Sequence, residues 1–126
     1  AVAAANTLLD LKILTIGDYY APDLTGFTGL AGLEVLNIHK GSMESLEGIQ
    51  SLRRLYTLSV GFNAVSDLRP LAGLEQLNYV QLEELPITDF SPLMQLPALE
   101  YVVVPQNQAE RVEADCPAHT FELRTY

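Results

Sequence analysis

The side chains that could take part in nucleophilic catalysis are few in this sequence. Ser59 could serve as a nucleophile with His39 as its base, but no acid is placed beside His39 to orient its imidazole. Cys116 is the only cysteine, and the acidic residues near it would raise the pKa of its thiol and disfavour the reactive thiolate. We therefore expect no catalytic triad, and we expect Cys116 to be a small buried residue.

A second place for chemistry is the segment at 17–23, whose carboxyl and phenol groups could act as acid and base. The groups are those of Asp18, Tyr19, Tyr20 and Asp23. A phosphate-binding pattern of the form Gly-x-x-x-x-Gly-Lys does not occur. We favour a chain that is not an enzyme and uses no cofactor, with an acid–base site in 17–23 as the alternative.

These residues must be positioned by a repeat with a period of 22 residues, which runs from Leu11 to Val112 without insertion or deletion. Positions four, six, eleven, fourteen, seventeen and twenty of the repeat are apolar in nearly every copy. Position one is always leucine, at Leu11, Leu33, Leu55, Leu77 and Leu99. A fixed period of this size is typical of a solenoid.

Each repeat has two halves with different spacing. The pattern Leu-x-x-Leu-x-Leu predicts a short strand whose alternate side chains point inward. The return half has apolar residues three apart, such as Leu68, Leu71 and Leu74, which suits a 3-10 turn or a short helix. Because one unit cannot bury its inner face, stacked units share a continuous core. The fold class is therefore an α/β solenoid: a right-handed leucine-rich-repeat superhelix with a short parallel sheet on the concave side and 3-10 or short helices and turns on the convex side.

The repeat resembles the internalin-type leucine-rich repeats of bacteria. The resemblance lies in the 22-residue length, in Asp at position thirteen and in Pro at position sixteen, as in Asp67 with Pro70 and Asp89 with Pro92. It implies the solenoid fold. In that family position nine is Asn, whose side chain caps the turn after the strand. Here position nine is Tyr19, Gly41, Asn63, Leu85 and Asn107, so we expect the asparagine ladder to be interrupted.

One domain is expected, with repeats at 11–32, 33–54, 55–76 and 77–98. Residues 1–10 could be the second half of an earlier repeat or a helical cap. In the fourth repeat, Ser91 before Pro92 predicts a helix N-cap. Residues 99–126 contain the last repeat strand, a short capping helix and a terminal strand, which we place 19 residues after the fifth strand by aligning Ala118 with Leu99.

Composition restricts the partners. The 126 residues include 16 acidic and 7 basic ones, a net charge of −9, which disfavours nucleic acid. No apolar run is long enough to span a membrane, and no secretory signal peptide is recognisable. A single cysteine excludes an intrachain disulfide, which favours the cytoplasm over secretion.

The concave face is the candidate binding site, because positions three, five and seven point there and position eight lies at the strand exit. The candidate residues are Thr57, Ser59, Phe62, Tyr79, Gln81, Glu83 and Tyr101. We expect a module for recognition of a protein partner of unknown identity. The aromatic pair Tyr79–Tyr101 could instead only stabilise the sheet. The alternative function is a C-terminal sensor or cap of a larger bacterial signalling or effector protein.

A metal site is not expected on this face. His39 and Glu83 both occupy position seven, but they lie two strands apart. Their backbones should then be about 10 Å apart, which is too far for routine joint coordination.

Overall fold

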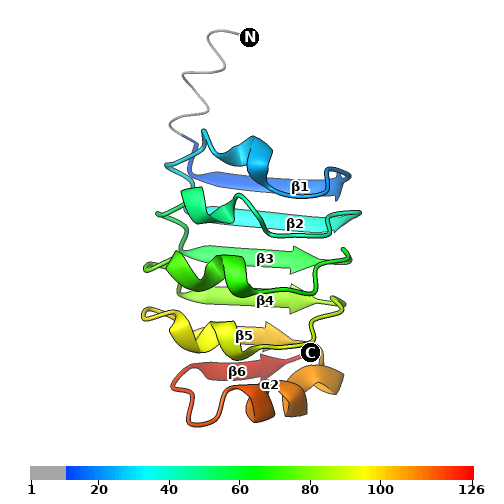
Figure 1. The fold of residues 1–126 in the computed structure, drawn as a ribbon, viewed down its shortest axis with the longest axis vertical. Helices are drawn as coiled ribbons and strands as arrows, with labels where there is room; N and C mark the ends of the chain where they lie inside the picture. The colour runs from blue at the N-terminus through cyan, green and yellow to red at the C-terminus, as the bar shows by residue number, and fades with distance from the viewer. Residues whose placement is uncertain (1–10) are drawn as a thin grey trace, which may run out of the picture.

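The computed structural model describes residues 11–126; residues 1–10, with the expected partial repeat or cap, lie outside the described residues. Six parallel strands form one sheet in chain order (Figure 1). Their bounds are β1 Ile13–Tyr19, β2 Val35–Gly41, β3 Thr57–Gly61, β4 Tyr79–Glu83, β5 Tyr101–Val104 and β6 Glu122–Thr125. The predicted leucine-rich-repeat solenoid is confirmed.

Short helices return the chain along one face of the sheet, which leaves the other face open (Figure 1). Their bounds are η1 Thr25–Phe27, η2 Ile49–Ser51, η3 Arg69–Gly73, η4 Ser91–Gln95, η5 Gln106–Gln108 and α2 Ala109–Asp115. The first five are 3-10 helices, as the spacing of three predicts. None of the helices in residues 11–126 has the length and apolar character that crossing a membrane requires.

The strand register follows the 22-residue period. Ile13 pairs with Val35, Val35 with Thr57, Thr57 with Tyr79, and Tyr79 with Tyr101. This register stacks equal positions of successive repeats, so the apolar positions form one core. Leu58, Val80 and Val102, which all occupy position four, are fully buried within it.

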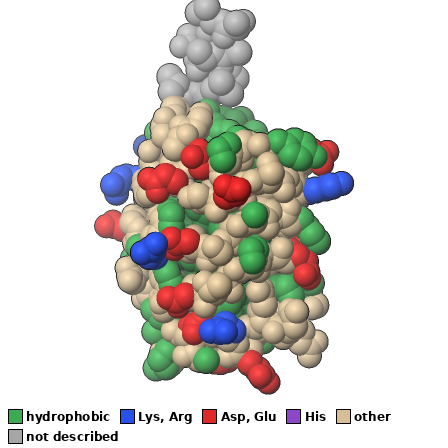
Figure 2. Space-filling view, turned by 45° about the vertical axis from the view of Figure 1, so that its right-hand side comes forward, with side chains coloured by type: hydrophobic (Ala, Val, Ile, Leu, Met, Phe, Trp, Pro, Cys, Tyr) green, Lys and Arg blue, Asp and Glu red, His purple; other side chains and the backbone are tan. Residues whose placement is uncertain are grey.

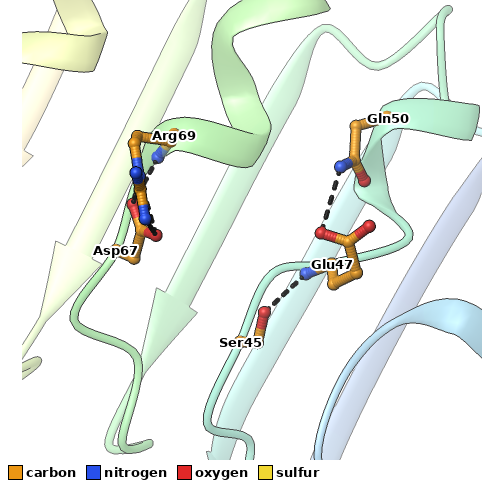
Figure 3. Close-up of polar contacts among 5 residues, drawn as sticks. All are labelled: Ser45, Glu47, Gln50, Asp67 and Arg69. Carbon is orange, nitrogen blue, oxygen red and sulfur yellow. Dashed lines mark hydrogen bonds and ion pairs between the residues drawn. The ribbon is translucent and has the colours of Figure 1, made fainter.

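Position thirteen supports the turn that leads into each helix. The side-chain oxygen of Asp67 accepts a hydrogen bond from the backbone N–H of Arg69 at 2.9 Å, and Ser45 accepts one from Glu47 at 3.0 Å (Figure 3). Asp89 likewise accepts the N–H of Ser91 at 2.9 Å. The prediction of Ser91 as N-cap is therefore wrong, because Ser91 lies inside η4 and its own N–H needs the cap.

Position nine behaves as the interrupted ladder predicts. Asn63 accepts the N–H of Met43 at 3.1 Å and donates to the carbonyl of Gly61 at 2.8 Å. In the fourth repeat, where Leu85 has no polar group to offer, the side chain of Gln108 donates to the Leu85 carbonyl at 3.0 Å. One asparagine and one glutamine thus replace part of a continuous ladder.

The C-terminal end closes the core with α2 and β6, as expected, but the register of β6 differs from the prediction. Glu122 pairs with Tyr101, a step of 21 residues instead of 19. The prediction placed Phe121 at the core position beside Val102, whereas Leu123 lies there. Phe121 is instead buried at the entry to the strand, where its ring stacks on His119 at 3.9 Å. The aromatic pair covers the end of the core, where no further repeat follows within the described chain.

Candidate protein-binding face

The open sheet face consists of the side chains at positions three, five and seven of the strands. In β3, Leu58 and Val60 point into the core, so Thr57, Ser59 and Gly61 belong to the open sheet face. The helices cover the opposite side of the sheet (Figure 1). Six of the seven predicted residues, all except Phe62, lie on strands at these positions.

An aromatic pair occupies the open sheet face near its C-terminal end. The rings of Tyr79 and Tyr101 lie 6.3 Å apart between centroids and are tilted by 44°. The guanidinium of Arg124 lies 4.5 Å from the centroid of Tyr101, in cation–π contact, and also pairs with Glu122. Sequence reasoning missed Arg124 because the predicted register of β6 was wrong; its position between Glu122 and Thr125 in an alternating strand was the available signal.

A hydrogen-bonded row runs along β4. The Tyr79 hydroxyl donates to Oε1 of Gln81 at 3.1 Å, and Nε2 of Gln81 donates to Oε1 of Glu83. All three side chains are partly exposed. Because each hydrogen bond restricts the rotamers of its partners, this row is held in place before any ligand arrives.

His39 and Ser59 meet across β2 and β3, where Nε2 of His39 lies 3.4 Å from Oγ of Ser59. Within residues 11–126, no hydrogen bond or ion pair joins His39 to Glu83, and Ser59 is only 7% exposed. The contact therefore does not extend to a triad. It fixes the ring of His39 against the open sheet face.

Phe62 lies apart from the two tyrosines. It occupies position eight at the exit of β3, is 53% exposed and has φ of 54°. Asp18, Lys40 and Glu84 at the same position are also left-handed, with φ between 51° and 68°, so the turn itself imposes this conformation. A bulky residue is costly there, so an exposed phenylalanine is not a choice made for folding.

The segment 17–23 uses its polar groups for its own structure. The Tyr19 hydroxyl donates to the carbonyl of Asp23 at 2.6 Å, and burial raises the pKa of Tyr19, with a further contribution from Asp23. Oδ1 of Asp23 accepts hydrogen bonds from the hydroxyl and the N–H of Thr25, which lower the pKa of Asp23. These groups cap a turn and are not arranged around a common point.

The charge of the molecule is predominantly negative, and Figure 2 shows acidic side chains scattered over the helical side and one edge, with fewer basic ones among them. Near the exit of β4, burial raises the pKa of Tyr126, and the carboxylates of Glu83 and Glu84 raise it further. This edge of the open sheet face therefore has a negative potential.

Solved structures show the same fold, whereas no family model and no curated protein matches the chain. Internalin C2 from Listeria monocytogenes superposes with a TM-score of 0.71 at 30% sequence identity, over 82% of this chain and 46% of that one. A chain of the Drosophila melanogaster SNF/U2A′ complex superposes with a TM-score of 0.64 at 20% identity, over 76% of this chain and 61% of that one.

Both of these are leucine-rich-repeat proteins, a class that generally serves in binding and not in catalysis. This chain spans less than two thirds of either matched chain. The likeness to internalin C2 agrees with the sequence features at positions thirteen and sixteen, Asp67 with Pro70 and Asp89 with Pro92. The chain folds as an internalin-type leucine-rich-repeat solenoid.

Proposed function

We propose that this module recognises a protein partner through its open sheet face and carries out no catalysis of its own. The observation that carries the proposal is the arrangement of Tyr79, Gln81, Glu83, Tyr101 and Arg124, which gathers aromatic and polar groups on three adjacent strands. Tyr and Arg are the residues that most often supply binding energy in protein interfaces.

Two further observations support this reading. The aromatic and polar groups are partly exposed but held by hydrogen bonds and a cation–π contact, so binding would cost little side-chain entropy. A solved neighbour is a component of a complex, SNF/U2A′, which agrees with a protein as the partner of this fold.

The proposal is tested by affinity capture from the source lysate with the chain as bait, followed by titration of the captured protein in purified form. Three baits are compared: the parent chain, the double variant Tyr79→Ala/Tyr101→Ala, and a control double variant Tyr20→Ala/Tyr56→Ala. Tyr20 and Tyr56 are 66% and 53% exposed and lie off the open sheet face. Circular dichroism melting shows that each variant is folded.

We expect a protein that binds the parent chain and the control, and that binds the Tyr79→Ala/Tyr101→Ala variant at least about tenfold more weakly. Equal binding by all three baits would place the interface elsewhere on the molecule. Failure of the parent chain to retain any protein would count against recognition by this module.

A further inference from the structure

Gly61 creates a notch in the open sheet face between two side chains of opposite chemical character. A Cβ atom added at Gly61 would lie 3.2 Å from Nδ1 of His39 and 3.4 Å from Oε2 of Glu83. The side chains come from β2 and β4, on either side of β3. The sequence argument separated them by about 10 Å of backbone, but both lean over the glycine, since it has no side chain to hold them apart.

The two facing atoms are held in place by their partners. Oε1 of Glu83 accepts a hydrogen bond from Gln81, which leaves Oε2 toward the notch. Nε2 of His39 lies against the Ser59 hydroxyl, which leaves Nδ1 toward the notch. Within residues 11–126, neither Oε2 of Glu83 nor Nδ1 of His39 takes part in a hydrogen bond or ion pair. A donor placed just outside Gly61 could therefore reach both acceptors.

The charge at this place favours a cationic donor. Glu122 and Arg124, which also lie on the open sheet face, neutralise each other. Glu83 makes no ion pair among the described residues, and Glu84 adds a second negative charge at the strand exit. The whole chain has a net charge of −9, so it attracts basic segments at a distance as well.

We propose that the notch formed by Gly61, His39 and Glu83 receives a lysine or arginine side chain of the protein partner. The cationic N–H groups donate to Oε2 of Glu83 and to Nδ1 of His39, whose Nε2–H then donates to Ser59. The Tyr79–Tyr101 pair, one strand further along, offers apolar surface to the adjoining part of the partner. This inference rests on the proposed function and assigns the chemistry of the partner.

A metal ion does not account for the notch as well. Two protein ligands face it, whereas protein metal sites use at least three. Among residues 11–126, no group of three or more His, Cys, Asp and Glu side chains is placed to hold a metal ion.

The test uses a random peptide library displayed on phage and selected against the immobilised chain. Selected peptides should be enriched in lysine or arginine, and their affinity should fall as salt is added. Synthetic copies of these peptides are then titrated by calorimetry against the parent chain, Glu83→Gln, Gly61→Ala and Glu84→Gln. The last is a matched control, because it removes one negative charge from the neighbouring residue.

We expect Glu83→Gln to weaken binding about tenfold, since a charge-assisted hydrogen bond is lost. Gly61→Ala should weaken binding similarly, because its methyl group fills the notch without requiring a left-handed backbone. Glu84→Gln should change the affinity by less than about twofold.

The outcomes separate the two proposals. Peptides that lose binding to Tyr79→Ala/Tyr101→Ala but show no basic enrichment, or bind Glu83→Gln as well as the parent chain, would overturn the notch and leave the proposed function standing. An equal loss with Glu83→Gln and Glu84→Gln would reduce the effect to general charge attraction and would also overturn the notch. A library that yields no binding peptide would count against both.

Discussion

At the residue scale, Cys116 shows how this fold disposes of a potentially reactive group. The side chain is fully buried at the end of α2, and its thiol donates to the carbonyl of Phe90 at 3.2 Å. Burial raises the pKa of Cys116 to about 11, with smaller contributions from Asp115, Asp89 and Glu113. The thiol is therefore protonated at neutral pH and packs as a small apolar residue, as the sequence predicts.

This environment predicts an alkaline loss of stability. The folded-state pKa of Cys116 lies above the ordinary thiol value of 9.0, so the unfolded chain loses its proton first as pH rises. The contribution of Cys116 to stability is therefore present below pH 9 and is lost progressively as pH rises through about 11. Urea unfolding at a series of pH values should show this decline, and Cys116→Ala should flatten it.

Tyrosines titrate in the same range, so the difference between the parent chain and Cys116→Ala is the relevant quantity. An identical alkaline decline in both proteins would contradict the assignment. Rapid alkylation of Cys116 in the native protein near neutral pH would contradict it as well.

At the element scale, the turn before each short helix depends on the residue at position thirteen. Asp67 accepts the N–H of Arg69 and also forms an ion pair with its guanidinium at 2.8 Å. The pKa of Asp67 is lowered chiefly by the Arg69 side chain and then by its backbone N–H. Since Ser45 forms the same backbone contact without any charge, the cap is the shared feature and the ion pair is an addition (Figure 3).

We expect Asp67→Ala to lower the free energy of unfolding by about 1 kcal/mol, the usual effect of removing a side-chain cap. Asp67→Asn keeps an accepting oxygen and should lose much less. Arg69→Ala should change stability little, because the ion pair is exposed on the surface. Urea denaturation at neutral pH measures all three, and an Asp67→Asn variant as unstable as Asp67→Ala would assign the effect to charge.

At the scale of the whole molecule, the solenoid needs closed ends because a parallel sheet exposes unpaired backbone groups at its edge. The cap of α2 and β6 covers β5 and part of the core. Besides the pairing of β5 with β6, Oδ2 of Asp115 accepts the N–H of Phe90 at 3.0 Å, and Gln108 donates to Leu85. Asp115 breaks the apolar position seventeen and compensates by this hydrogen bond.

Deleting residues 109–126 should therefore cause self-association. The deletion uncovers the backbone of β5 together with buried Phe90 and Val102. Light scattering should show oligomers or aggregates of the shortened chain, whereas a chain that lacks only Tyr126 should behave as the parent does. A shortened chain of unchanged size and full helical and strand content would contradict a protective role for the cap.

The sequence by itself determined the repeat, the five repeat strands, the 3-10 returns and the buried positions. It could do so because one period places every apolar residue in a column, and stacked columns of Leu58, Val80 and Val102 leave a single arrangement that buries them all. The same period also placed Tyr79, Gln81 and Glu83 on one face of one strand.

Only the tertiary structure decided which side chains meet between strands. His39 and Glu83 face a common point because Gly61 offers no side chain between them, and this depends on rotamers that a period does not specify. Arg124 covers Tyr101 because β6 is displaced by 21 residues from β5, at the point where the period fails. The period is imposed by burial in the core, so it carries no information about exposed contacts or about a terminal strand that has no further repeat to match.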